Sequence, residues 1–554
     1  NIYFSNGYYG VGAAAKGYFG KDVSELTLSE QAFIAAIPNN PTRYNPLTNF
    51  DNTIERRDNI LARLYNEDII SSMNYYTAID SDIELSKQPV ASKNNSVETY
   101  ARHCATESMM QAGGFIFRTN FYSDDDYEEY RKLYEESYTL YQQKLMSGGY
   151  SVYTSINMDL QEKLQAAVDD NLENYTSMKD GIYEMQSAAT CIDNTTGNVV
   201  AIVGSRTQEL EGYTLNRAYQ SYRQPGSSIK PIIDYVPYLQ KGNTPDTIVA
   251  DEYIQNGPKN ADGTYMGNIT LRTAVSLSRN TVAWNILKEL TPKVGSSYLL
   301  NQGFHKIWMD KDYNAISIGG FTYGVSTEEM AGAYATIAND GKYRRVTCIV
   351  AVYDNRGKTV IDTSNREENI YDSESCRMMT DMLKTVVSEG TGRGAAPDDA
   401  IVAGKTGTTN SNYDSWFCGY SAYYTLAVWQ GYDYPASIPQ NATIKIFRQF
   451  MDQAHKGLAK KDFAKYNQKG NQEETQTETE SETETETQSA SETKTETQSV
   501  SQTQSVKHTQ KGSQSQTQAS SQRETGTVRD TDETVSVNPD VDRPAETKSD
   551  NLIN

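Results

Sequence analysis

Three short segments of this 554-residue chain hold residues whose types and spacing suit covalent catalysis. In the first, residues 223–231, Ser227 precedes Lys230 by three positions. Two more follow in order along the chain: Ser278-Arg279-Asn280 and Lys405-Thr406-Gly407-Thr408. Residues three apart lie on one face of a helix, so Lys230 can take the proton of the Ser227 hydroxyl and activate it as a nucleophile.

The distribution of histidine favours a serine–lysine mechanism over a serine–histidine one. A Ser-His-Asp triad needs a histidine that is held in a folded cleft. The chain has only four histidines, and two of them lie at or inside a C-terminal end that we predict to be weakly structured. They are His103, His305, His455 and His508.

Lys230 can act as a base only in its neutral form, whereas a free lysine has a pKa of about 10.4. If Lys405 places a second ammonium within about 4 Å, repulsion at an effective dielectric of ~20 amounts to ~4 kcal/mol, or roughly three pKa units. Burial acts in the same direction. We therefore predict that the two lysines share one cleft, with Lys230 as the base and Lys405 as the residue that holds an anion.

The strand edge around Gly407 meets a second requirement of acyl transfer. Glycine has no side chain, so a substrate backbone can lie against this edge. The backbone N–H of Thr408, with that of Ser227 at a helix start, is predicted to form an oxyanion hole. Pro231 disfavours helical dihedral angles at Lys230, so we expect the first turn to be distorted.

Each segment alone also has a non-catalytic explanation. Ser227 can cap a helix while Lys230 points into solvent. Ser278 and Asn280 can be capping or loop residues, and Arg279 is predicted to lie on the surface.

Only one of the three segments is unique. A second Ser-x-x-Lys occurs at 491–494, and Ser-x-Asn recurs elsewhere, whereas Lys405-Thr406-Gly407 occurs once. The three segments together, in this order and in their predicted contexts, favour the catalytic interpretation.

A hairpin pattern, with two strand segments joined by a turn at 194–197, and three later strand segments predict the strands that would position these segments. Helical patterns fill the sequence between an early and a late group of strands. We predict one α/β domain over 185–437, with a roughly five-stranded antiparallel sheet built from the two ends of its sequence and helices on both faces. The expected strands are 188–193, 198–203, 400–407, 415–420 and 424–430, and the helical patterns between them include 273–290, 328–339 and 375–388.

The flanking sequence divides into four parts. Residues 1–80 are predicted to be mostly α-helical, 81–184 to link two domains, and 438–469 to form a C-terminal helical extension. The last part, 470–554, is rich in Ser, Thr, Gln and Glu and has no aromatic residue. Such a tail buries too little apolar area to offset chain entropy, so we predict that it is disordered.

Composition excludes several classes of function. Of the net charge of −21, the stretch 471–554 contributes 17 acidic against seven basic residues, so the folded part is only mildly acidic. We therefore expect no nucleic-acid partner. The five scattered cysteines argue against a disulfide framework and a zinc cluster, and we expect no metal or cofactor. No run of about 18 apolar residues suggests a membrane span in this stretch.

Together these segments resemble the class A (bifunctional) penicillin-binding proteins of bacterial peptidoglycan synthesis. The resemblance covers most of residues 1–437 and is specific in the transpeptidase part. It rests on RQPGSSIKP at 223–231, SRNT at 278–281, GGFTYGVS at 319–326, EMAGAYA at 329–335, GKTGTT at 404–409 and DSWF at 414–417.

The resemblance implies a serine acyl-enzyme mechanism. Ser227 would attack the penultimate D-Ala–D-Ala carbonyl of a stem peptide, with Lys230 as base and Ser278 as proton relay to the leaving amine. Asn280 would hold the substrate amide. The strand that contains Gly407 would border the substrate, and its neighbours Lys405, Thr406 and Thr408 would hold the terminal carboxylate. β-Lactams would acylate Ser227 and remain as inhibitors.

The N-terminal stretch resembles the last third of the family's glycosyltransferase domain, through 1–15, 26–32 and 38–41, with Ser5 where the family usually has Gly. This implies that the chain is a fragment without the catalytic glutamates and the membrane anchor of the intact protein. The intact protein would be anchored at the extracytoplasmic face of the cell membrane. Its partners would be stem peptides and glycan strands or lipid II.

Two other functions share parts of this pattern. A D,D-carboxypeptidase or a β-lactamase passes the acyl group to water, and a β-lactam sensor is acylated once and signals. Neither class carries a glycosyltransferase module, so residues 1–80 favour the transpeptidase.

Overall fold

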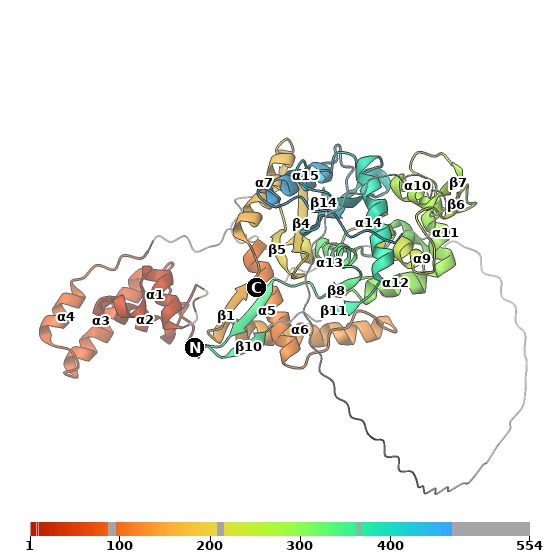
Figure 1. The fold of residues 1–554 in the computed structure, drawn as a ribbon. Coiled ribbons are helices and arrows are strands. Elements are labelled where there is room, and N and C mark those ends of the chain that lie inside the picture. Colours follow the sequence, from red (N-terminus) through yellow and green to blue (C-terminus); the bar gives the residue numbers. More distant parts are fainter. Residues whose placement is uncertain are drawn as a thin grey trace, which may run out of the picture. The chain divides into compact units, whose positions relative to one another are not determined.

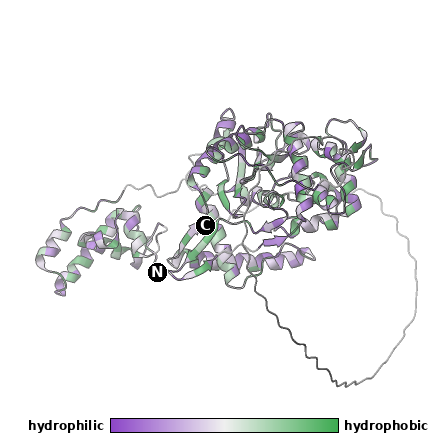
Figure 2. Ribbon diagram, viewed as in Figure 1, coloured by the Kyte–Doolittle hydropathy of each residue, from purple (hydrophilic) through white to green (hydrophobic). Residues whose placement is uncertain are grey.

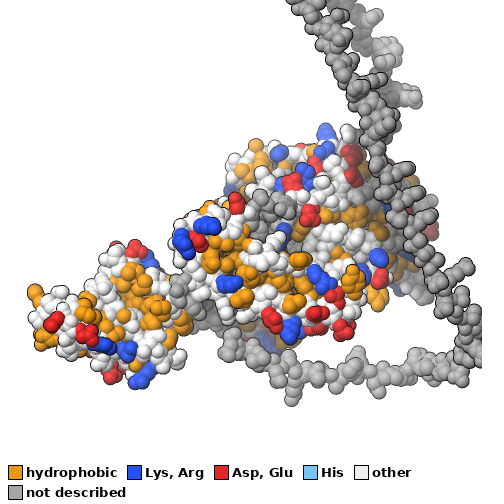
Figure 3. Space-filling view, turned by 90° about the horizontal axis from the view of Figure 1, so that it is seen from below, with side chains coloured by type: hydrophobic (Ala, Val, Ile, Leu, Met, Phe, Trp, Pro, Cys, Tyr) orange, Lys and Arg blue, Asp and Glu red, His pale blue; other side chains and the backbone are white. Residues whose placement is uncertain are grey.

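The computed structural model describes residues 2–467, apart from Gly7, Tyr9, 87–95, 208–214 and 363–366. The predicted disordered tail, 470–554, lies outside the described residues. Within the described helices, no segment is both long and apolar enough to cross a membrane. On the face seen in Figure 3, basic and acidic side chains are interspersed among apolar ones.

The centre of the α/β domain is a five-stranded antiparallel sheet in the order β12-β13-β14-β4-β5. Figure 1 labels β14, β4 and β5 of this sheet. Strand β14 pairs with β4, so Trp429 lies opposite Ala188 and the two ends of the domain's sequence meet in mid-sheet. This confirms the predicted fold class. The strands are β4 (Met185–Asp193), β5 (Val199–Val203), β12 (Ala403–Thr408), β13 (Asp414–Tyr420) and β14 (Tyr424–Tyr432).

Alternation along the strands separates two hydrophobic cores, because successive side chains point to opposite faces. In β13, Trp416 and Cys418 belong to one core and Phe417 to the other. Helices α7 (Met158–Leu172) and α15 (Thr443–Ala454) pack on the Phe417 side, and α13 (Thr327–Ala338) and α14 (Ser373–Ser388) on the Trp416 side. Helices α7, α14 and α15 mix hydrophilic and hydrophobic residues, as expected for helices with one buried side (Figure 2), whereas α13 is enclosed by its neighbours.

A mostly helical region lies between β5 and β12. One prediction here was wrong: the helix expected over 273–290 is broken into α10 (Leu271–Ser276) and α11 (Asn280–Leu290). Its helices are α8 (Arg217–Gln220), α9 (Val236–Leu239), α10, α11, α12 (Pro292–Leu300), α13 and α14; its strands are β6 (Ile248–Asp251), β7 (Gly267–Thr270), β8 (Lys342–Arg344), β9 (Ile349–Tyr353), β10 (Thr359–Asp362) and β11 (Glu367–Asn369).

The break has a local cause. The N–H of Arg279 donates to the carbonyl of Ala274, and that of Ser278 to the carbonyl of Val275, which is the Schellman pattern of a helix end. Ser278 takes the left-handed position, with φ of +60°, that glycine usually fills. The apolar spacing continues through this point, so the sequence pattern did not reveal the break.

The sequence before the sheet domain is also mainly helical. Helix α2 begins at a capping box in which Thr27 and Glu30 satisfy each other's backbone N–H groups, and it ends before Pro38. The elements are α1 (Val11–Phe19), α2 (Leu28–Ala36), α3 (Phe50–Asn66), α4 (Ser72–Ile79), α5 (Ser96–Ala112), α6 (Asp124–Ser147), β1 (Ser151–Thr154), β2 (Met178–Lys179) and β3 (Ile182–Tyr183).

Candidate active site

Ser227 lies in a tight turn rather than in an α-helix. Residues Gly226–Ile229 form a 3₁₀ turn in which the N–H of Lys230 donates to the carbonyl of Ser227. Pro231 has no N–H, and the next turn, Pro231–Tyr235, is π-helical before α9 begins. The expected distortion is therefore present. Ser227 is half-buried, whereas Lys230, one turn later, is completely buried.

The ammonium of Lys230 is held by three acceptors. Its Nζ donates to the carbonyl of Ser278 at 2.8 Å, to Oδ1 of Asn280 at 2.7 Å and, more weakly, to Oγ of Ser278 at 3.4 Å. Burial lowers the pKa of Lys230 to about 7, with Asp234 opposing and Arg279 assisting. The sequence-based hypothesis that repulsion from Lys405 sets this pKa was wrong in its emphasis, because desolvation is the largest cause.

Lys405 approaches the same serine from the edge strand β12. It is completely buried, and its Nζ donates to Oγ of Ser278 at 2.9 Å and to the carbonyl of Thr406 at 3.1 Å. Burial, and then the neighbouring Lys230, hold the pKa of Lys405 well below its usual range. The structure thus brings both predicted lysines to one hydroxyl, without a carboxylate that pairs with either of them at short range among the described residues.

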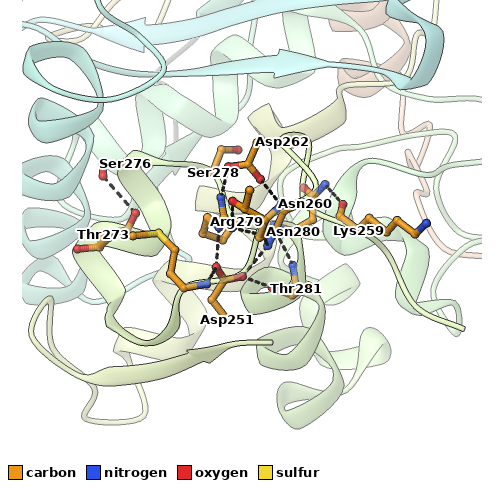
Figure 4. A network of polar contacts seen from close by, with 12 residues as sticks. Asp251, Lys259, Asn260, Asp262, Thr273, Ser276, Ser278, Arg279, Asn280 and Thr281 are labelled. Atoms are coloured by element: carbon orange, nitrogen blue, oxygen red, sulfur yellow. Dashed lines mark hydrogen bonds and ion pairs between the residues drawn. The ribbon is translucent and has the colours of Figure 1, made fainter. Parts of the chain in front are cut away.

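Ser278 contacts both lysines and Asn280 contacts Lys230, and the two residues sit on either side of the break between α10 and α11. Arg279, predicted to lie on the surface, is 3% exposed and forms ion pairs with Asp251 at 2.7 Å and Asp262 at 2.8 Å (Figure 4). The prediction failed because both carboxylates come from the β6–β7 hairpin, which is remote in sequence from Arg279.

The edge strand β12 lies directly against the serine turn. A Cβ added at Gly407 would lie 2.1 Å from the carbonyl oxygen of Pro225, and one at Gly226 would lie 2.6 Å from the carbonyl oxygen of Thr408. Gly226 also has a φ of +53°, which favours glycine. Two glycines therefore allow the backbone of the nucleophile turn to touch the strand that carries Lys405.

The remaining predicted site residues lie at the end of β12. Thr406 donates its hydroxyl to that of Thr391 at 2.8 Å, and Thr408 is exposed. Gly319, with φ of +84°, lies behind the serine turn, and a Cβ there would be 2.4 Å from the backbone nitrogen of Gly226. All eight predicted residues thus lie on elements that meet around one point: the serine turn, the α10–α11 break and β12.

Sequence reasoning missed several residues around this site. Asp234 is fully buried one turn after Lys230, and Asp251 and Asn260 support the α10–α11 break. Only Asp234 carried a signal, as an acidic residue in an otherwise apolar helical stretch. Among the described residues, no cluster of His, Cys, Asp or Glu could hold a metal, and the five cysteines are buried and free.

Comparisons with known proteins agree with this architecture. Residues 187–452 match the family described as the penicillin-binding protein transpeptidase domain, and residues 1–65 match the transglycosylase family. Penicillin-binding protein 4 of Bacillus subtilis is 34% identical over 442 residues, which cover 79% of this chain and 68% of that protein. Penicillin-binding protein 1A of Streptococcus pneumoniae is 32% identical over 499 residues, covering 83% of this chain and 64% of that one.

A solved structure shows the same fold. The crystal structure of penicillin-binding protein 1A from Haemophilus influenzae matches with a TM-score of 0.61 at 21% identity, covering 84% of this chain and 85% of that one. The chain spans 57% of the length of penicillin-binding protein 1F from Bacillus subtilis, and thus little more than half of some relatives. It belongs to the class A penicillin-binding proteins, which combine a transglycosylase module with a serine D,D-transpeptidase domain for synthesis of the bacterial cell wall.

Proposed function

We propose that Ser227 is the nucleophile of a D,D-transpeptidase that cross-links peptidoglycan stem peptides. Its oxygen attacks the carbonyl of the penultimate D-Ala, the terminal D-Ala leaves as an amine, and an amine of a second stem peptide resolves the ester. Bonds and protons balance in both steps, because the acyl group passes from nitrogen to oxygen and back to nitrogen.

Lys230 and Ser278 move the proton in this proposal. Neutral Lys230 removes the proton of the Ser227 hydroxyl, and the burial that lowers its pKa to about 7 makes the neutral form available at physiological pH. The Ser278 hydroxyl, in contact with both lysines, then passes a proton to the leaving amine. Asn280 orients the substrate amide from the same segment.

Lys405, Thr406 and Thr408 hold the terminal carboxylate of the substrate, with the strand at Gly407 alongside it. A buried amine with a lowered pKa regains its proton when an anion binds beside it, because the opposite charge favours the ammonium. The substrate therefore supplies the charge partner that Lys405 lacks. The N–H groups of Ser227 and Thr408 form the oxyanion hole.

One observation supports this function most strongly. Two fully buried lysines, from segments 175 positions apart in the sequence, converge on the hydroxyl of Ser278 beside the serine turn. Burying two lysine amines without a paired carboxylate destabilises a fold, which is the expected cost of a site built to bind an anion and move a proton.

We propose two further properties for the intact protein. It polymerises glycan strands from lipid II through the complete transglycosylase domain and is anchored at the outer face of the cytoplasmic membrane. The divisions near residues 80, 184, 437 and 469 remain predictions, as do stem peptides and β-lactams as ligands of this chain.

Covalent labelling of the full chain with a fluorescent penicillin tests the function. We expect labelling of the wild type, none of Ser227→Ala, and retained labelling of Ser228→Ala. The Ser228 hydroxyl is a matched control because it is buried and donates to the carbonyl of Pro225 at 2.7 Å. Labelling that survives in Ser227→Ala contradicts the proposal.

A further inference from the structure

A buried polar network lies behind the Ser278–Asn280 segment, and its centre is a carboxylate that the reaction itself does not use (Figure 4). Asp251, at the end of β6, is completely buried. It accepts hydrogen bonds from Arg279 Nε at 2.7 Å, Thr281 Oγ1 at 2.5 Å, Asn260 Nδ2 at 2.6 Å and the backbone N–H of Met266 at 3.0 Å. Four donors around one carboxylate fix its position and favour its ionised form.

Arg279 connects this carboxylate to a second one. Its guanidinium bonds Asp251 on one edge and Asp262 at 2.8 Å on another, and it also donates to the carbonyl of Thr264. Figure 4 shows Arg279 between the two acidic side chains, both of which come from the hairpin region of β6 and β7. A planar guanidinium with several charge-assisted bonds is a rigid fastening, and it leaves little freedom to the backbone that carries it.

The same network reaches the substrate-binding amide. Asn260 Oδ1 accepts the backbone N–H of Asn280 at 2.7 Å, at the start of α11. The side chain of Asn280 donates to the carbonyl of Lys259 at 2.8 Å and accepts from Lys230 at 2.7 Å. Backbone and side chain of Asn280 are thus both held, and the hairpin contributes two of the three contacts.

Ser278 needs this support because of its backbone conformation. A left-handed conformation is unfavourable for a residue other than glycine, so it persists only where its surroundings fix it. Its carbonyl and hydroxyl must both face the lysines, at 2.8 Å from Lys230 and 2.9 Å from Lys405. The helix-end bonds hold one side of the break, and the buried Arg279 holds the other.

We propose that Arg279 and Asp251 are positioning residues, whose ion pair fastens the β6–β7 hairpin to the α10–α11 break and so orients Ser278 and Asn280 for acylation of Ser227. The inference rests on the proposed function of the site. Neither residue exchanges a proton with the substrate or touches the reacting atoms.

The charge of Arg279 gives this positioning role a measurable effect that is separate from stability, namely a shift in the pKa of Lys230. The groups that act on Lys230 are Asp234, which raises its pKa, and Arg279, which lowers it, with Lys405 across the Ser278 hydroxyl. Loss of the guanidinium charge therefore raises the pKa of Lys230, and the acid limb of the acylation rate moves to higher pH. A packing defect that admits water to Lys230 would shift the limb in the same direction, because burial is the largest cause of its lowered pKa. Arg279→Lys, which alters the packing but keeps the charge, separates the two causes.

The experiment measures penicillin acylation rates of the full chain against pH, with thermal unfolding of each variant. Arg279→Gln is expected to acylate about 10²-fold more slowly, the scale of a misplaced catalytic group, with its acid limb at higher pH. Arg279→Lys keeps the charge, so its limb stays in place while its rate is still reduced. The matched control is Arg272→Gln on α10, which loses an ion pair with Asp381 but leaves the break untouched; its acylation should equal that of the wild type.

Two results would overturn the proposal. One is a folded Arg279→Gln that acylates like the wild type; the other is a slower variant whose acid limb stays at the wild-type pH. If Arg279→Gln does not fold, Arg279→Lys decides, because it keeps the charge but cannot make the bonds of the planar guanidinium to both Asp251 and Asp262. We expect it to fold and to acylate more slowly, and an unchanged rate overturns the inference. Failure of the wild type to be acylated would instead contradict the proposed function.

Discussion

The side-chain nitrogens of Lys230 and Lys405 both contact the hydroxyl oxygen of Ser278. The distance is 3.4 Å from Nζ of Lys230 and 2.9 Å from Nζ of Lys405. The two lysines come from opposite sides of the site, the serine turn and the edge strand. Both are fully buried, so each side chain depends on its neighbours for solvation. The relationship explains why one amine can be neutral while the other is ready to accept an anion.

The acylation rate is expected to rise with pH across neutrality. Lys230 must be neutral to accept the proton of Ser227, and burial lowers its pKa to about 7. Below that pH the protonated fraction dominates, so the rate should fall about tenfold for each pH unit, and above it the rate should level off. Stopped-flow acylation by penicillin between pH 5.5 and 8.5 checks this, and a rate that is flat or falls with increasing pH contradicts it.

Lys405→Gln separates burial from charge repulsion as the cause of that pKa. Because burial is the largest cause, we expect the acid limb to stay near pH 7. The acylation rate should nevertheless drop by roughly 10²-fold, since an electrostatic contact to the anion is lost. Lys384→Gln, which removes a surface pair with Asp462, serves as the control and should keep the wild-type rate. A limb displaced upward by a full unit would instead favour repulsion.

Gly407→Ala should separate the edge strand from the serine turn. The added methyl would lie 2.1 Å from the carbonyl oxygen of Pro225 and 2.8 Å from Oγ of Ser228, so the backbone must shift. We expect a loss of about 1–3 kcal/mol in the free energy of unfolding and strongly reduced acylation. Gly12→Ala in α1 is the matched control, because nothing lies within 4 Å of its added methyl. Denaturant unfolding and penicillin labelling measure both effects, and wild-type labelling of Gly407→Ala would refute the close packing.

Asp234→Leu should stabilise the domain at neutral pH. Asp234 is fully buried, neither carboxylate oxygen has a hydrogen-bond partner among the described residues, and burial raises its pKa well above the usual range. Stability from this group is present below the unfolded pKa of about 3.9 and is lost as the pH rises toward the folded value. The variant should therefore gain about 1–3 kcal/mol at pH 7 and little at pH 3.5.

Urea unfolding at the two pH values measures this gain. Asp310→Leu is the contrasting variant. The carboxylate of Asp310 is buried but accepts hydrogen bonds from the backbone N–H and the hydroxyl of Thr322, so this substitution should destabilise the protein. A gain for Asp234→Leu that is equal at both pH values, or a loss at pH 7, would show that the carboxyl is satisfied in the folded protein.

Much of the sheet was predictable because its strands are short apolar runs bounded by turn residues, as in β5. The prediction that both ends of the domain's sequence contribute strands to one sheet was correct, and the structure adds the pairing of β14 with β4. The adjacent residues Trp416 and Phe417 point to opposite faces of that sheet. The distortion of the serine turn was also predictable, because Pro231 has no backbone N–H to donate to the helix.

The support of the site was not predictable in the same way. The left-handed Ser278 arises from helix-end bonds and from a hairpin remote in sequence, and no local pattern in 273–290 marks it. The prediction that Arg279 lies on the surface failed for the same reason. A charged residue is buried only where carboxylates from elsewhere in the sequence pair with it, and here these are Asp251 and Asp262. The pKa of Lys230 depends on desolvation, which is a property of the packed cavity rather than of sequence spacing.

The most direct test of the central claim is mass spectrometry of the full chain after treatment with penicillin and proteolysis. The account predicts one adduct, with the mass of the intact β-lactam, on the peptide that contains Ser227, and fragmentation that places it on that residue. An adduct on Ser278, on Ser228 or on any other residue, or no adduct on a folded chain, would contradict it.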